Sequence, residues 1–301
     1  LEPQLLPLLC ATTPVNRGDY NLNRLAIGKF ILIGDHKQLP AVVSQPREMS
    51  RVTEDSLQAI GLTDCRNSLF ERLQGTEGIV EMLHRQGRMH PSICEFVNRN
   101  YYNGGLDAVP LPHQQEPLAF GIRPDDDRWT AFVAGTRMAF ISVQADEAEY
   151  YIKSNKREAE TVAHLVHTLC QLHSRSGIPF SPCRQIGIIV PFRAQIAMIR
   201  KALAERHIPD TADITIDTVE RYQGSQRDII IFSTTVSRPY QLPILSEPVM
   251  TDGRELDRKL NVALTRARKQ FFMTGNETLL RKCTAYREFL DFLSKGQILR
   301  L

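Results

Sequence analysis

The chain has 301 residues, enough for about two domains with a large buried core, so a small disulfide-stapled scaffold is excluded. Apolar residues make up 42% and charged residues 24% of the chain, which is typical of a folded globular protein. Lys and Arg number 37 against 34 Asp and Glu, and the net charge of +3 is too small to indicate a polyanionic partner by itself.

Apolar runs and polar boundaries predict the first elements in chain order. Residues 29–34 form an apolar run that predicts a buried strand. The spacing of apolar residues predicts helices over 68–73 and 91–101. Residues 103–129 are rich in Gly, Pro and Asp and are expected to be loop. A strand is then expected over 138–143.

Strands and helices alternate in the second half. The predicted elements are a long helix over 156–173, a strand over 186–190, a basic helix over 193–206, an all-apolar strand over 229–235, a helix over 256–268, a strand over 270–274 and a helix over 277–293 that breaks near Cys283. An all-apolar strand is typical of the inside of a parallel sheet. The alternation predicts an α/β fold with a parallel sheet and helices on both faces.

Cysteine and histidine spacing predicts no metal site. The six cysteines, at positions 10, 65, 94, 170, 183 and 283, include no CxxC pair, which indicates reduced thiols. The nearest approach to a ligand cluster is His164, His167, Cys170 and His173. Each step of three residues turns a helical side chain by about 60° backwards, so His164 and His173 are expected on opposite sides of the helix. No run of roughly 18 apolar residues predicts a membrane span, and a cytoplasmic setting is expected.

Two clusters of polar residues stand near ends of predicted elements in the first third of the chain. Residues 34–40 (GDHKQLP) offer a carboxylate, a cation and an amide at the carboxyl end of a strand, where parallel sheets gather ligands. Residues 86–91 (QGRMHP) place Arg88 just before a helix that starts at Pro91. By themselves, the first cluster fits a surface loop equally well, and the second fits an arginine that braces the helix through a carboxylate.

Two further clusters lie near the C-terminus. Residues 217–228 (DTVERYQGSQRD) bridge two predicted strands, and residues 261–269 (NVALTRARK) end a predicted helix. Arg266 and Arg268 are two positions apart, about 200° around a helix, so they cannot share one face. We expect one of them to reach a ligand and the other to pair locally or face solvent.

Together the four clusters resemble the later motifs of superfamily 1 helicases, in the branch that contains the nonsense-mediated-decay RNA helicase and the Okazaki-fragment helicase-nuclease. Residues 34–40 resemble GDxxQLP, 86–91 resemble QYRMHP, 217–228 resemble VDxFQGxExD and 261–268 resemble NVALTRAR. Shorter matches are SLFERL at 68–73, then Asn155, Glu158 and Ala159, and then Pro191, Phe192 and Gln195. The resemblance spans nearly the whole chain.

The resemblance implies two RecA-like domains with ATP and Mg²⁺ in the cleft between them and single-stranded nucleic acid across the top. Residues 1–76 then correspond to the end of the first domain and 77–301 to the second. Hydrolysis needs positioned cations, because charge develops on the transferred phosphoryl group. Arg88 and Arg266 match the two arginine fingers. Gln38 matches the amide that senses the terminal phosphate, and Asp35 supports the same loop.

The resemblance also implies contacts to the nucleotide and to the strand. Gln223 and Gly224 match the turn that couples the two ligands, where glycine lets the backbone approach closely. Val190, Pro191 and Thr218 fall where the family contacts the phosphate backbone of a single strand. Whether that strand is DNA or RNA stays open.

Three positions depart from the family pattern. Gly87 replaces a tyrosine that packs on the adenine, and Gln226 replaces a glutamate near the ribose and phosphates. Val190 replaces a hydroxyl residue. The departures fit a divergent helicase, and they also fit a binding module that keeps the strand-contact surface without hydrolysis.

The phosphate-binding GxxxxGKS/T motif does not occur in the sequence. Residues 146–149 (DEAE) share only their wording with the acidic Mg²⁺ motif, and we expect them to form a solvated loop. In the family, that motif is followed closely by a segment like residues 2–7. We therefore expect a C-terminal helicase portion, inactive alone, whose missing N-terminal portion lies in the same or another polypeptide.

Overall fold

The computed structural model describes residues 2–17, 20–40, 43, 46–74, 79–144, 153–246, 248–251 and 253–301. The chain divides into two compact units, Leu1–Met82 and Leu83–Leu301. The expected loop at 146–149 lies outside the described residues. The assignment of 1–76 and 77–301 to two RecA-like domains stays a prediction.

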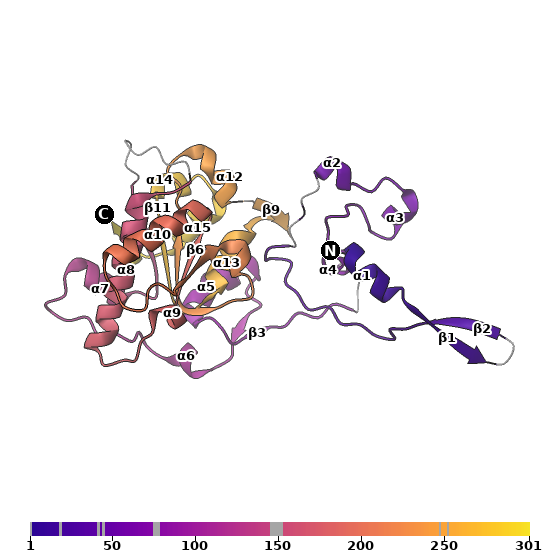
Figure 1. Cartoon of the computed structure of the whole chain (residues 1–301), viewed down its shortest axis with the longest axis horizontal. Coiled ribbons are helices and arrows are strands. Elements are labelled where there is room, and N and C mark those ends of the chain that lie inside the picture. The colour runs from indigo at the N-terminus through magenta and orange to yellow at the C-terminus, as the bar shows by residue number, and fades with distance from the viewer. Residues whose placement is uncertain are drawn as a thin grey trace. The chain divides into compact units, whose positions relative to one another are not determined.

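The first unit is made of short elements (Figure 1). They are α1 (Glu2–Leu9), the antiparallel hairpin β1 (Thr12–Arg17) and β2 (Tyr20–Leu25), α2 (Arg47–Ser50), α3 (Asp55–Ala59) and α4 (Leu69–Leu73). Within the described residues, the strand expected over 29–34 is not formed, and Ile31 and Ile33 are 75% and 88% exposed. A strand needs hydrogen-bonded neighbours and a surface to cover its apolar side chains, and the described part of this unit supplies neither.

The second unit is an α/β fold around a six-stranded sheet of order β12-β5-β11-β8-β6-β7. All neighbouring strands in it are parallel. The strands are β5 (Met138–Ser142), β6 (Ile186–Val190), β7 (Thr215–Thr218), β8 (Arg227–Ser233), β11 (Ala267–Gly275) and β12 (Ile298–Arg300). The parallel sheet and the strands expected over 138–143, 186–190, 229–235 and 270–274 are confirmed.

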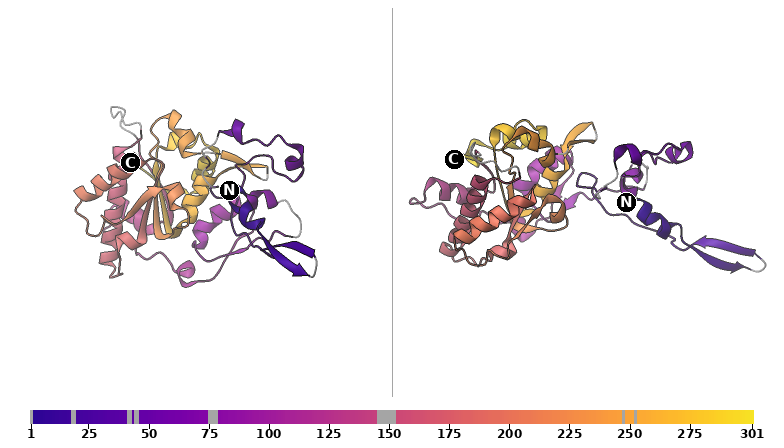
Figure 2. Two further views of the ribbon diagram at one scale, coloured as in Figure 1. Left: turned by 45° about the vertical axis from the view of Figure 1, so that its right-hand side comes forward. Right: turned by 45° about the horizontal axis from the view of Figure 1, so that its top comes forward.

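Helices cover both faces of this sheet, as predicted, because alternate strand residues point to opposite faces. One face, which includes Ile188, Ile231 and Phe272, packs against α7 (Arg128–Gly135), α8 (Lys156–Arg175) and α10 (Arg193–Glu205). On the other face, Phe271 contacts Phe289 of α15 (Thr284–Phe292), which contacts Phe96 of α5 (Pro91–Tyr101). Figure 2 shows helices on both sides of the strands.

The helix expected over 256–268 is shorter in the structure. α13 (Arg258–Thr265) begins after Asp257, whose carboxylate accepts a hydrogen bond from the Leu260 N–H at 2.7 Å and caps the helix. The residues before it form β10 (Arg254–Asp257), antiparallel to β9 (Pro248–Thr251), and those after it enter β11. The break near Cys283 is confirmed between α14 (Glu277–Leu280) and α15.

Short elements complete the second unit. They are β3 (Arg85–Gln86), β4 (Asp107–Ala108), α6 (Pro112–Gln115), α9 (Pro182–Gln185), α11 (Val219–Tyr222), α12 (Leu242–Leu245) and the 3-10 turns Pro239–Gln241 and Lys295–Gln297. Two of them, β4 and α6, interrupt the loop expected over 103–129. No helix among the described residues combines the length and apolar character that a bilayer crossing requires.

Candidate functional site

The loop that carries Arg88 joins β3 to α5 and is held by its own side chains. The Gln86 Oε1 accepts hydrogen bonds from the backbone N–H groups of Arg88 at 2.9 Å and Met89 at 2.8 Å. The His90 Nδ1 accepts from the Ser92 N–H at 3.2 Å and caps α5. Arg88 therefore lies in a loop that is held by hydrogen bonds, between the end of a strand and the start of a helix.

The Arg88 guanidinium donates to neutral acceptors. Its Nε donates to Gln226 Oε1 at 3.0 Å, and its Nη1 donates to the Thr265 carbonyl at 3.1 Å. Burial lowers the pKa of the Arg88 guanidinium below its ordinary value, and the nearby Tyr102 opposes that shift. Within the described residues no carboxylate forms an ion pair with Arg88, so the alternative of an arginine braced by a carboxylate is not what these contacts show.

Arg266 lies at the C-terminal end of α13 and is only 2% exposed. Its Nε donates to the Val262 carbonyl at 3.1 Å, and its Nη2 donates to the Thr265 hydroxyl at 3.0 Å. A longer bond of 3.5 Å runs from Nη1 to the Ser225 carbonyl. Thr265 thus contacts both guanidinium groups, through its carbonyl for Arg88 and its hydroxyl for Arg266. The structure brings the two predicted fingers together where β8 and β11 begin.

Arg268 is the arginine that pairs locally. The chain changes from helix to strand at Arg266, so Arg268 belongs to β11 and not to α13. Its Nη1 lies 2.9 Å from the Asp228 carboxylate in β8. Of the two arginines, Arg268 is thus the one that pairs with a carboxylate, and the ligand contact expected of Arg266 stays a prediction.

The predicted nucleotide-side residues lie on two loops around Arg88. Gln223 and Gly224 are exposed on the turn between α11 and β8, three and two positions before Gln226. Gly224 has φ +88°, a left-handed conformation that glycine adopts without strain. Gly87 is exposed in the Arg88 loop, where an added Cβ would lie 3.1 Å from Leu111 Cδ1.

The residues predicted to contact a nucleic-acid strand lie at the carboxyl ends of the β-strands, whereas the two arginines lie near their amino ends. Val190 and Thr218 are register partners at the carboxyl ends of β6 and β7, and Pro191 follows directly. Val190 is 0% exposed, whereas Pro191 and Thr218 are partly exposed, and a strand contact at these positions stays a prediction. Along β8, five residue steps separate Arg227 from Phe232, which is level with the end of β6. At about 3.3 Å per step, the amino and carboxyl ends of the sheet are about 17 Å apart along β8.

A buried carboxylate joins the carboxyl ends of β8 and β11. Glu158 of α8 is 0% exposed, and its Oε2 accepts bonds from the Ser233 hydroxyl at 2.8 Å, the Thr235 N–H at 3.0 Å and the Thr274 hydroxyl at 3.0 Å. Asn155, which caps α8, donates to Glu158 Oε1 at 3.3 Å. Burial raises the pKa of Glu158 to about 7, although these bonds oppose the shift.

Gln195 extends this network to the Pro191 turn. Its Oε1 accepts from the Asn155 N–H at 2.7 Å, and its Nε2 donates to the Ser233 hydroxyl at 3.3 Å. Two of the shorter sequence matches, Asn155 with Glu158 and Pro191 with Gln195, thus meet in one cluster. We predicted no role for Glu158 from the sequence. Its position four residues before apolar Val162, on the same face of the helix, was the signal that could have indicated a buried carboxylate.

Asp35 and Gln38 belong to the first unit, whereas the two arginines belong to the second. The Gln38 amide donates to the Asp35 carboxylate at 2.7 Å, so these two residues contact each other within one loop. The loop rests on α4, where the Phe70 ring lies 3.4 Å from the position of a Cβ on Gly34. The GDHKQLP and SLFERL segments therefore contact each other.

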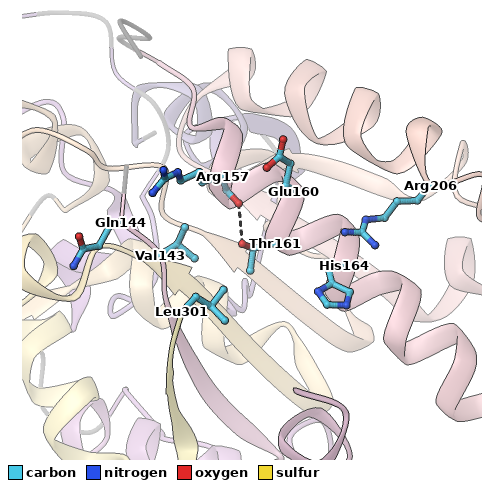
Figure 3. A pocket seen from close by; sticks show the side chains of 8 residues that line it. All are labelled: Val143, Gln144, Arg157, Glu160, Thr161, His164, Arg206 and Leu301. Carbon is cyan, nitrogen blue, oxygen red and sulfur yellow. Dashed lines mark hydrogen bonds between the residues drawn. The ribbon is translucent and has the colours of Figure 1, made fainter. Parts of the chain in front are cut away.

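The histidines of α8 lie in different surroundings. His164 stacks on Trp129 at a ring distance of 4.5 Å, and His173 stacks on Phe180 at 3.6 Å. His164 lines a hollow of about 420 Å³ with Val143, Gln144, Arg157, Glu160, Thr161, Arg206 and Leu301 (Figure 3). Burial and the Arg206 charge lower the pKa of His164. In the described part of the chain, no three His, Cys, Asp or Glu side chains are grouped as metal ligands.

Comparisons with known proteins show which family the chain belongs to. A family model described as an AAA domain matches residues 65–278. The chain is 28% identical, over 97% of its length, to the 3'-5' exoribonuclease HELZ2 of Mus musculus and 27% identical, over 90%, to the DNA replication ATP-dependent helicase/nuclease DNA2 of Mus musculus. It is 29% identical, over 85%, to the DNA polymerase alpha-associated DNA helicase A of Saccharomyces cerevisiae. It covers 9%, 24% and 35% of these three proteins. The chain therefore belongs to this AAA-domain family and, as its motifs indicate, resembles the superfamily 1 helicases.

Proposed function

We propose that the chain is the C-terminal part of a cytoplasmic, ATP-dependent superfamily 1 helicase in which Arg88 and Arg266 stabilise charge on the terminal phosphate. The observation that carries this proposal is the meeting of both guanidinium groups at Thr265, with Arg88 bonded to neutral acceptors. A partly buried cation is stabilised most by an anion, because neutral acceptors only partly replace its lost hydration. An outer phosphate is such an anion.

The surrounding residues would border the nucleotide. Gln226 fixes the Nε of Arg88 and so directs its remaining donors. Gln223 and Gly224 lie on an exposed turn whose backbone groups would contact the bound nucleotide. Gly87 supplies no ring where the family has one, and Leu111 lies close to the place where its Cβ would be. ATP with Mg²⁺ would supply the phosphoryl group whose hydrolysis drives movement along the strand.

The other half of the nucleotide site would come from an N-terminal helicase portion, in the same or another polypeptide. Phe30, Ile31 and Ile33 form an exposed apolar run, and we propose that this run joins a sheet supplied by that portion. Gln38, fixed by Asp35, would then sense the terminal phosphate from the first unit.

Pro191 and Thr218 would contact the backbone of single-stranded DNA or RNA. Their partly exposed positions at the carboxyl ends of β6 and β7 support this assignment. Backbone contacts of this kind make affinity fall with rising salt, because bound counterions are released. Filter binding of single strands across a salt series should therefore give a negative slope.

The test is the single-strand-stimulated ATPase of the full-length protein. Arg88→Ala and Arg266→Ala are each expected to lower kcat on the order of 10³-fold, the loss typical of an arginine finger. Arg281→Ala is the matched control, because Arg281 pairs with the Asp291 carboxylate at 2.6 Å and lies on another element. Finger variants that hydrolyse ATP like the control would contradict the assignment.

The alternative is a binding module without hydrolysis. Gly87 and Gln226 favour it, since the family has a tyrosine and a glutamate at these positions. A full-length protein that binds single strands but has no ATPase, with or without the finger substitutions, would support this alternative.

A further inference from the structure

His113 contacts the backbone of the Arg88 loop. It lies in α6, within the stretch expected to be loop, and is 8% exposed. Its Nε2 is 2.9 Å from the Arg88 carbonyl, and its Nδ1 is 3.3 Å from Arg268 Nη2. One imidazole therefore joins the Arg88 backbone to a second arginine.

The two partners fix the hydrogen on this imidazole. The Arg88 carbonyl can only accept, so Nε2 carries the hydrogen, and the Arg268 guanidinium can only donate, so Nδ1 keeps its lone pair. The neutral Nε2–H tautomer satisfies both contacts. In the Nδ1–H tautomer, the Nδ1–H would face the N–H of Arg268, and the Nε2 lone pair would face the Arg88 carbonyl oxygen.

The far side of His113 is a fixed ion pair. Arg268 Nη1 lies 2.9 Å from the Asp228 carboxylate, and both residues belong to central strands of the sheet. The adjacent Gln114 is 3% exposed, and its Nε2 donates to the carbonyls of Gln86 at 3.1 Å and Met89 at 2.9 Å. Three carbonyls of the Arg88 loop are thus bonded by α6, which in turn is anchored to the sheet.

We propose that His113 is a positioning residue that sets the reach of Arg88 through the Arg88 carbonyl. The inference rests on the proposed function, because it needs Arg88 to act on a phosphate. The guanidinium leaves the same residue whose carbonyl His113 holds, so a shift of that backbone moves the charge. A displacement of roughly 1 Å at a reacting centre costs on the order of 10²-fold in rate.

Substituting His113 by Gln or by Asn tests its two hydrogen bonds one at a time. A glutamine amide reaches the place of Nε2 and can donate to the Arg88 carbonyl. An asparagine amide reaches only the place of Nδ1 and can accept from Arg268. His113→Gln therefore keeps the bond to the Arg88 loop, and His113→Asn keeps the bond to the sheet.

The experiment compares these variants in the full-length protein by steady-state ATPase with single-stranded nucleic acid. We expect His113→Asn to lower kcat by about 10- to 100-fold with little change in KM, because only the position of a transition-state charge has changed. His113→Gln should restore most of kcat. His84→Asn is the matched control, since the His84 Nδ1 lies 2.9 Å from the Gly105 carbonyl, outside the Arg88 loop.

Equal kcat values for the two His113 variants, or losses that follow their thermal midpoints, would overturn the inference. Arg88→Ala is measured beside them. If it retains kcat, both the finger assignment and the role of His113 fail. If it loses kcat while His113→Asn does not, only the role of His113 fails. A second readout is the ¹⁵N spectrum of the His113 imidazole in the chain, where the Nδ1–H tautomer would refute the geometry.

Discussion

Glu158→Gln is expected to remove a pH dependence from the stability of the protein. Burial raises the pKa of Glu158 from 4.5 to about 7, because ionisation costs more inside the fold than in the unfolded chain. The folded state therefore holds a proton that the unfolded state releases. This contribution to stability is fully present below pH 4.5 and is lost as the pH rises through 7.

The size of the effect follows from the two pKa values. A shift from 4.5 to about 7 corresponds to about 3 kcal/mol. Glutamine cannot ionise, and its oxygen at the Oε2 position can still accept from Ser233, Thr235 and Thr274. Its amide then faces the Asn155 Nδ2, so the 3.3 Å bond is lost at every pH, at about 1 kcal/mol. The variant should thus be slightly less stable than the wild type at pH 5 and more stable at pH 8.

Urea unfolding at a series of pH values measures this difference, with equal m-values as the check on two-state behaviour. Glu160→Gln is the control, because the Glu160 side chain is 52% exposed on the same helix. It should leave the pH dependence of the wild type unchanged. If Glu158→Gln and the wild type lose stability in parallel between pH 5 and 8, the buried carboxylate is not the group that titrates.

Three other substitutions test single features of the fold. Thr274→Val removes a hydroxyl that lowers the pKa of Glu158, so the stability loss should move to higher pH in the same urea assay, whereas Thr211→Val, which removes a hydroxyl bonded to the Ile208 carbonyl, should not move it. Gly224→Ala should lower the free energy of unfolding by about 1 kcal/mol, since alanine resists φ +88°, whereas Gly296→Ala, in open space, should have little effect in a thermal melt. Val190→Thr should cost about 1–3 kcal/mol by burying a hydroxyl and leave strand affinity unchanged in filter binding, because that side chain is 0% exposed; a gain in affinity would contradict the burial.

The parallel sheet was predictable because its signal is local. β6 and β8 are continuous apolar runs with polar ends, and α8 keeps one apolar face over its length. The apolar run at 29–34 carries the same local signal, yet no described strand pairs with it. The end of α13 was misplaced because helical periodicity continues through Arg268, while hydrogen bonding to β8 draws the chain into β11 from Ala267.

The candidate site was predictable only where a motif marked it. Arg88 and Arg266 stand in recognisable segments, and they meet at Thr265 through a tertiary contact between the β3–α5 loop and the end of α13. His113 and Gln114 carried no signal, because a four-residue helix is too short to show an apolar period. Their contacts are to backbone carbonyls, which any sequence possesses.

The strands β8 and β11 both run from the arginines at one end of the sheet to Glu158 at the other. β8 begins beside Gln226, which holds Arg88, and its carboxyl end carries Ser233, which bonds Glu158. β11 begins after Arg266, and Thr274, one residue before its end, bonds the same carboxylate. Both strands are central and packed on both faces, and about 17 Å separates Arg227 from Phe232 along β8. In the proposed function, a nucleotide at the arginines and a single strand near Pro191 would therefore lie toward opposite ends of these two strands.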